Sequence, residues 1–117
     1  MEKDRAVLAL SALAQETRLD AFRLLVRREP KGLPAGEIAE RLTVPQNTMS
    51  AHLNVLTRAG LVTSERHSRS IVYRANLDRL ADLTLYLVKD CCGGSQAVCE
   101  PLAAELSLVV GRAKVKS

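Results

Sequence analysis

Three cysteines are the residues of this 117-residue chain whose type and spacing could do chemistry. Cys91 and Cys92 are adjacent, Gly93 and Gly94 follow them, and Cys99 comes shortly afterwards. Thiolates are soft ligands that bind soft metal ions, and a pair of thiols can also be oxidised to a disulfide. Because glycines leave the backbone free to fold back, the three sulfurs can be brought together. The segment therefore indicates either a thiol metal site or a redox switch.

Other uses of these cysteines are less favoured, but several stay open. A disulfide between Cys91 and Cys92 is disfavoured, because neighbouring Cα atoms lie about 3.8 Å apart and bridged ones roughly 4.4–6.8 Å. Oxidation of Cys99 with one of the pair remains open, and so do inert thiols. A zinc site would need a fourth ligand from Asp90, water or a partner chain. A thiol enzyme is disfavoured, because the cysteines follow a helix C-terminus and form no CxxC motif. We therefore expect no enzymatic activity.

The composition fits one small domain over residues 1–100, followed by a C-terminal tail over residues 101–117. The chain is 47% apolar and 26% charged, which is typical of a single globular domain. No apolar run approaches the roughly 20 residues that a membrane-spanning helix needs. A secretory signal begins with a positively charged segment, but here Glu2 and Asp4 are acidic. We therefore expect a cytoplasmic protein. A chain of this size buries a thin core, which favours a dimer.

The positive charge is concentrated in the middle of the chain. Nine basic and four acidic residues lie between Arg23 and Arg74, whereas the rest of the chain has eight basic and nine acidic residues. Such a concentration is expected of a surface that binds a polyanion. The three aromatic residues are Phe22, Tyr73 and Tyr86, too few for the stacking platforms of single-strand binders. Double-stranded DNA is therefore the expected partner.

The spacing of apolar residues predicts helices over residues 3–13, 17–29, 35–42 and 46–59. In the first helix Val7, Leu10 and Leu13 form one stripe. The apolar face predicted for the second helix contains four residues, Leu19, Phe22, Leu25 and Val26. A tight turn at residues 43–45 joins the third helix to the fourth, because Pro45 cannot continue a helix but suits the first turn of the next.

The fourth helix has one apolar and one polar face. Met49, Leu53 and Leu56 share a face, while Arg58 lies on the opposite side with small and amide residues. Amide side chains pair with adenine edges and arginine pairs with guanine, so this helix suits a major groove. Two short helices joined by a tight turn predict a helix-turn-helix. The expected DNA contacts on this helix are Gln46, Asn47, Thr48, Ser50, Ala51 and Asn54. A solvated surface helix is the alternative.

A β-hairpin is predicted after Gly60, because residues 61–66 and 70–74 are rich in β-branched residues. A hairpin in this position is a wing, and Arg66 and Arg69 near its tip suit phosphate or minor-groove contact. His52 lies at the border of the recognition helix's buried face, as either a packing residue or a phosphate contact. The predicted fold class is mainly α with a β-hairpin wing, a winged helix-turn-helix.

The first helix and a long apolar helix over residues 77–88 are expected to pair with their copies in a homodimer. One small domain cannot cover the apolar surface of both helices. The residues expected at the dimer interface are Val7, Leu10, Leu80, Leu83 and Leu87.

With these elements in order, the chain resembles the ArsR/SmtB family of winged-helix metal-sensing repressors over roughly residues 5–100. Three stretches carry the resemblance, LSALAQETRLDAFRLL (Leu10–Leu25), GEIAERLTVPQNTMSAHLNVLTRAGLV (Gly36–Val62) and RHSRSIVYRAN (Arg66–Asn76). The wing departs from the pattern at Ser68, where many members have glycine. The resemblance implies a homodimeric repressor that binds an inverted-repeat operator in double-stranded DNA.

The resemblance also implies an inducer site. Family sites with cysteines at the start of the recognition helix or histidines in the last helix are not matched, since residues 41–47 and 77–89 lack them. Cys91, Cys92 and Cys99 look like the variety in which three cysteines bind arsenite. As(III) would then be the inducer, with Sb(III) as an alternative and no organic cofactor. The repressor would control genes of arsenic efflux or detoxification. A redox-sensing or zinc-sensing repressor of the same fold is the alternative.

Overall fold

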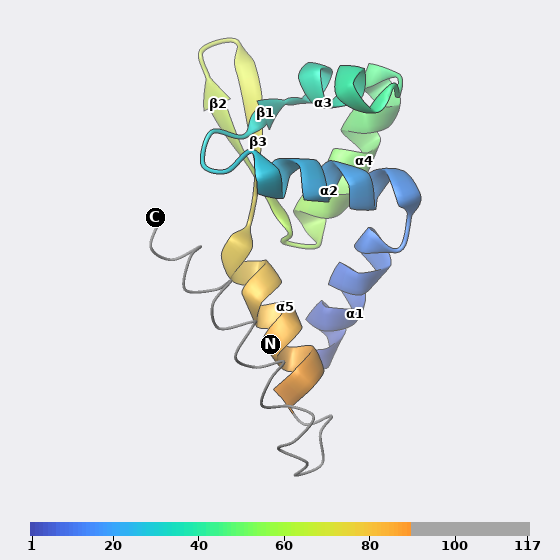
Figure 1. The fold of residues 1–117 in the computed structure, drawn as a ribbon, viewed down its shortest axis with the longest axis vertical. Coiled ribbons are helices and arrows are strands. Elements are labelled where there is room, and N and C mark those ends of the chain that lie inside the picture. The colour runs from blue at the N-terminus through green and yellow to red at the C-terminus, as the bar shows by residue number, and fades with distance from the viewer. Residues whose placement is uncertain (90–117) are drawn as a thin grey trace.

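Residues 1–89 are described by the computed structural model, and they form helices with a small sheet (Figure 1). The elements in chain order are α1 (Lys3–Leu13), α2 (Glu16–Arg27), β1 (Leu33–Pro34), α3 (Ala35–Leu42), α4 (Gln46–Arg58), β2 (Val62–His67), β3 (Ser70–Ala75) and α5 (Leu77–Lys89). The predicted fold class, mainly α with a hairpin wing, is confirmed.

The sheet is antiparallel, with β3 between β1 and β2. In the wing, the pairing of β2 with β3 runs from Val62 opposite Ala75 to His67 opposite Ser70. The short strand β1 was not predicted, because prolines and a glycine mark its segment as a loop. It places Leu33 opposite Tyr73, and its proline lies on an edge strand, where a missing N–H group is tolerated.

The core lies where α2, α3, α4 and the base of the sheet meet, and α4 packs into it as predicted. Met49, Leu53 and Leu56 are all fully buried. In α2 the predicted face is partly wrong. Leu19 is 41% exposed, and Leu24 is buried instead. The buried face of α2 is centred near Ala21 and Leu25, and at about 100° per residue Leu19 points away from it.

Helix α1 buries its alanines, so two residues of the predicted stripe face outward, while the third, Leu13, packs against the core. Ala6, Ala9 and Ala12 are buried, whereas Val7 is 54% exposed and Leu10 is 41% exposed. Small side chains let α1 approach α2, α4 and α5 closely. Three larger apolar side chains of α1 are therefore left on the surface of the single chain, those of Val7, Leu8 and Leu10.

Helix α5 runs beside α1, at the end of the molecule away from the wing (Figure 1). Leu83 is buried, and Leu77 and Leu80 pack against the core, while Tyr86 and Leu87 are exposed. In the part of the chain that the structure describes, no helix is long and apolar enough to cross a membrane.

Candidate nucleic-acid interface

Helix α4 is the centre of the candidate site, and the turn before it fixes its orientation. Thr43 lies in the left-handed region with φ 56°. Its N–H donates to the carbonyl of Glu40 at 3.2 Å, and the N–H of Val44 donates to that of Ala39 at 2.9 Å. These two bonds close the end of α3 in the pattern of a Schellman motif, which directs the chain into α4 at once.

The end of α4 is closed in the same way, but by a glycine. Gly60 has φ 79° and its N–H donates to the carbonyl of Thr57 at 3.0 Å. The N–H of Leu61 donates to the carbonyl of Leu56 at 3.1 Å, and both of these leucines are buried. With one face in the core, its C-terminus closed by Gly60 and a tight turn before its first residue, α4 has a fixed orientation and presents its other face outward.

The polar face of α4 is exposed as the sequence predicts. The residues expected to contact DNA are exposed or, for Ser50, half-buried; they are Gln46, Asn47, Thr48, Ser50, Ala51 and Asn54. Asn47 accepts a hydrogen bond from the backbone N–H of Thr48 at 2.9 Å. Over residues 1–89, the side chains of Gln46 and Asn54 form no hydrogen bond, so their amides can pair with base edges.

The wing carries exposed cations beside this helix. Arg66 and Arg69 are exposed, and within the described residues neither forms an ion pair. Ser68 forms the turn between them with φ 59°, a conformation that favours glycine. His67 lies 3.2 Å from the carboxylate of Glu65 (Nε2 to Oε2) on the same strand. Both arginines are therefore accessible, and their contact with phosphates stays a prediction.

Not all of the mid-chain positive charge is available to a polyanion. Arg74 pairs with Glu29 through two hydrogen bonds, Nη2 to Oε2 at 2.7 Å and Nε to Oε1 at 3.2 Å. The hydrogen bond to Glu29 raises the pKa of Arg74 above its ordinary value. Arg41 also has a partner, since its Nη2 lies 3.2 Å from Oε1 of Glu37. Arg74 is therefore neutralised by a largely buried carboxylate, whereas Arg41 is paired on the surface of α3.

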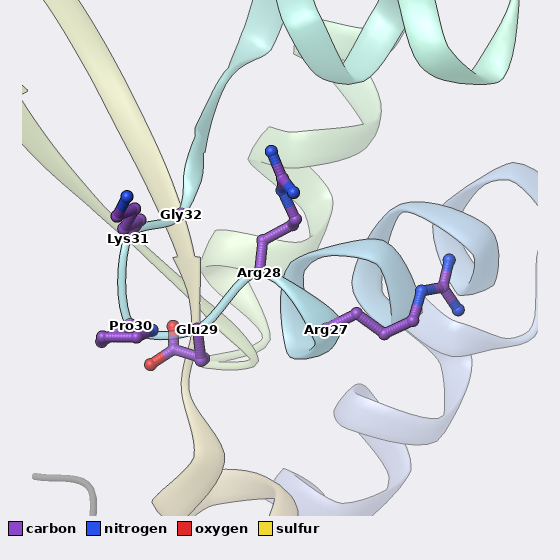
Figure 2. A pocket seen from close by; sticks show the side chains of 6 residues that line it. All are labelled: Arg27, Arg28, Glu29, Pro30, Lys31 and Gly32. Carbon is purple, nitrogen blue, oxygen red and sulfur yellow. The ribbon is translucent and has the colours of Figure 1, made fainter.

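A second basic surface lies on the loop between α2 and β1. It has a pocket of about 280 Å³, and the residues that line it are drawn in Figure 2: Arg27, Arg28, Glu29, Pro30, Lys31 and Gly32. Because β1 is antiparallel to β3, this loop lies beside the Tyr73–Arg74 end of β3, away from the wing tip. The basic loop is therefore separate from the surface that α4 and the wing tip form.

His52 makes a contact within the fold. Its Nδ1 lies 3.4 Å from Nη1 of Arg18, and Nε of Arg18 donates to the carbonyl of Ala12 at 2.7 Å. Arg18 thus joins the end of α1 to the middle of α4. Of the two interpretations of His52, packing is favoured.

The expected dimer residues fall into two groups. Val7, Leu10 and Leu87 are exposed on α1 and α5, whereas Leu80 and Leu83 pack into the chain's own core. Their contact with a partner chain stays a prediction.

The cysteines expected to bind a metal, Cys91, Cys92 and Cys99, lie outside the described residues. Among residues 1–89, no group of three histidine, cysteine or acidic side chains could hold a metal ion. The prediction of a metal site therefore depends on the sequence alone.

Asn76, between β3 and α5, links the end of α4 to α5, a role that the sequence analysis did not predict. Its side chain caps α5 and also bonds to the carbonyl of Gly60. An asparagine immediately before an apolar helix is a typical N-cap, so the cap could have been predicted. The second bond could not, because it joins segments that only the fold brings together.

Comparisons with known proteins identify regulators of transcription. Residues 13–65 match a protein family described as a helix-turn-helix domain. The chain is 38% identical over 82 residues to the repressor SmtB of Mycobacterium tuberculosis, which covers 70% of this chain and 58% of SmtB. It is 37% identical over 75 residues to the transcriptional activator HlyU of Vibrio cholerae, covering 62% of this chain and 67% of HlyU.

Solved structures agree. The structure of HlyU matches with a TM-score of 0.60 and 33% identity, covering 78% of this chain and 99% of HlyU. An ArsR-like transcriptional regulator from Rhodococcus sp. RHA1 matches with a TM-score of 0.66 and 26% identity, covering 91% of this chain and 92% of that one. These relatives regulate transcription, in agreement with the expectation that the chain is not an enzyme.

Proposed function

The chain belongs to the ArsR/SmtB family of winged-helix transcriptional regulators, and on this basis we propose that it is a homodimeric repressor of an inverted-repeat operator. The observation that carries the proposal is the exposed polar face of α4 beside a wing whose arginines have no ion-pair partner among residues 1–89. In the proposed complex α4 enters the major groove, with Asn47 and Asn54 at base edges. Arg66 and Arg69 contact phosphates on the flank.

The dimer forms through α1 and α5. Their exposed apolar residues, Val7, Leu10 and Leu87, are removed from water when two copies associate. A two-fold dimer places its recognition helices in successive major grooves, roughly 34–36 Å apart. An inverted repeat is the DNA counterpart of this symmetry.

As(III) is the proposed inducer, bound by the thiolates of Cys91, Cys92 and Cys99. Trivalent arsenic is a soft centre that three sulfurs satisfy in a pyramid, and soft ligands select soft partners. The cysteines follow α5 in the sequence, so their ligand acts next to a helix of the proposed dimer interface. Binding releases the operator if the DNA-free state binds As(III) more tightly, and DNA then weakens As(III) binding by the same factor.

The test is fluorescence anisotropy of the reduced chain on DNA from upstream of its own gene. Arsenite and zinc are titrated in parallel against the preformed complex. Micromolar-range release by arsenite and not by zinc is expected, and Cys99→Ser should shift release to much higher arsenite. A chain that binds DNA at low salt but ignores arsenite would contradict the inducer and favour the redox or zinc sensor. Absence of DNA binding at low salt would contradict the repressor itself.

A matched control distinguishes the loss of a thiol from a general effect of substitution in this part of the chain. Ser107→Ala removes a hydroxyl from the same C-terminal part of the chain without touching a cysteine. This variant should release DNA at the wild-type arsenite concentration. If Cys99→Ser does so as well, three-thiolate binding is wrong.

A further inference from the structure

Asn76 joins the end of the recognition helix to the start of α5. Its backbone N–H donates to the carbonyl of Leu61 at 2.8 Å, and its side-chain Nδ2 donates to the carbonyl of Gly60 at 2.9 Å. Its Oδ1 accepts from the backbone N–H of Arg79 at 3.2 Å, and its own carbonyl accepts from that of Leu80 at 3.1 Å. One residue thus caps α5 and holds the segment that ends α4.

The acceptor on the α4 side is held in place. Gly60 closes the Schellman motif of α4 in the left-handed region, so its carbonyl has a fixed direction. The side chain of Arg79 covers Gly60, since a methyl group there would lie 2.9 Å from Cζ of Arg79. The first turn of α5 therefore contacts the end of α4 through Arg79 and through the amide of Asn76.

The backbone N–H of Asn76 continues the series of hydrogen bonds that pairs the two strands of the wing. Val62 and Ala75 are the last residues that pair in β2 and β3. The bond from the Asn76 N–H to the Leu61 carbonyl extends this ladder by one step. Because the ladder ends at Asn76, the wing, α4 and α5 meet at one residue.

We propose that Asn76 is a positioning residue that sets the angle between α4 and α5, and thereby the half-site spacing that the dimer accepts. The inference rests on the proposed function, in which α5 carries dimer contacts and α4 reads bases. A rotation of α4 relative to α5 is repeated in both copies, so it changes the separation of the two reading helices. DNA turns by about 34–36° per base pair, which makes spacing sensitive to that angle.

Two variants separate the bond between Asn76 and the Gly60 carbonyl from the cap that Asn76 provides to α5. Asn76→Asp keeps an oxygen that accepts from the Arg79 N–H, since aspartate caps helices as well as asparagine does. It replaces the Nδ2 donor with an oxygen that repels the Gly60 carbonyl. Asn76→Ser is also a good cap and adds no charge, and it removes the amide that donates to the Gly60 carbonyl.

The experiment uses the full chain and the half-site that it selects from random duplex DNA. Affinity is measured on a single half-site and on inverted repeats with the selected spacing, one base pair more and one base pair fewer. The wild-type chain should prefer the selected spacing by about tenfold or more. Both variants should bind the single half-site within about twofold of wild type but lose most of the preference among the three repeats.

Three other outcomes would contradict the proposal or the function on which it rests. Variants that keep the wild-type spacing preference would overturn the role of Asn76. Equal losses on the half-site and on all three repeats would also overturn it, because Asn76 would then only support the fold of the DNA-binding region. Circular dichroism and sedimentation show whether helix content and dimerisation are retained, and Asn76→Ser gives the test if the aspartate variant does not fold. A wild-type chain that binds no repeat contradicts the proposed function instead.

Discussion

At the scale of single residues, Thr43 occupies a backbone conformation that suits glycine. It is β-branched and exposed, with φ 56° in the turn between α3 and α4. The left-handed region costs a non-glycine residue about 1–2 kcal/mol, and glycine avoids this cost but has a more flexible unfolded state. We expect Thr43→Gly to raise the free energy of unfolding by about 1 kcal/mol, measured in urea.

A matched control is Thr57→Gly, in the helical backbone of α4. Its hydroxyl donates to the carbonyl of Leu53 at 2.8 Å, and glycine disfavours a helix, so this change should destabilise the chain. Destabilisation by both substitutions would show that the left-handed turn at Thr43 is not a source of strain.

The wing arginines make a second prediction at this scale. Replacing Arg66 and Arg69 with glutamine should weaken binding to operator and to unrelated duplex DNA alike, since phosphate contacts carry no sequence information. The slope of log K against log salt should fall by about 1 for each phosphate that the variant no longer neutralises. Arg41→Gln removes one positive charge, from an arginine paired with Glu37, and its slope should stay near wild type. If the salt slope of the wing variant is unchanged, the prediction that the wing arginines contact phosphates is wrong.

At the scale of elements, the pair between Glu29 and Arg74 ties the loop after α2 to β3. The Glu29 side chain is only 12% exposed, so Arg74→Gln leaves a largely buried carboxylate without its cation. We expect the free energy of unfolding to fall by about 1–3 kcal/mol. Glu37→Gln breaks an exposed pair within α3 and should cost less than about 0.5 kcal/mol. If the two substitutions lower the free energy of unfolding equally, burial of the Glu29 carboxylate does not strengthen its pair with Arg74.

The pH dependence of the pair follows from the raised pKa of Arg74. A cation with a raised pKa stabilises the fold fully below its unfolded pKa, and this stabilisation is lost only as pH rises through the folded one. Because both values lie far above neutrality, the difference between wild type and Arg74→Gln should stay constant from about pH 7 to about pH 9. If the difference in unfolding free energy shrinks over this pH range, the stabilisation does not come from the Arg74 cation with a raised pKa.

Which elements the sequence could predict depends on how local their causes are. The order of α3, turn, α4 and hairpin follows from nearby signals, such as Pro45 and the spacing of Met49, Leu53 and Leu56. The face of α1 was harder to predict, because alanines pack closely and leave the larger Val7 outside. The partners Glu29 and Arg74 are 45 residues apart and only the folded sheet brings them together.

At the scale of the whole molecule, the distribution of exposed apolar residues supports the proposed dimer surface. The single chain leaves Val7, Leu8 and Leu10 exposed on α1, and Leu85 and Leu87 exposed on α5. The two helices pack beside each other, away from the wing (Figure 1). A surface at this end allows two copies to associate while both wings and both α4 helices stay accessible to DNA.

Leu10→Lys tests this arrangement, because a charge buried without a partner opposes association. Removal of an unpaired charge from water costs several kcal/mol, so the dimer dissociation constant should rise by roughly a hundredfold or more. Sedimentation over a range of concentrations measures it. Ile71→Lys makes the same change at an exposed position on the wing and should leave the dimer intact. Because the two variants carry the same charge, a dimer that survives Leu10→Lys would exclude this face of α1, and with it the proposed spacing of the two recognition helices.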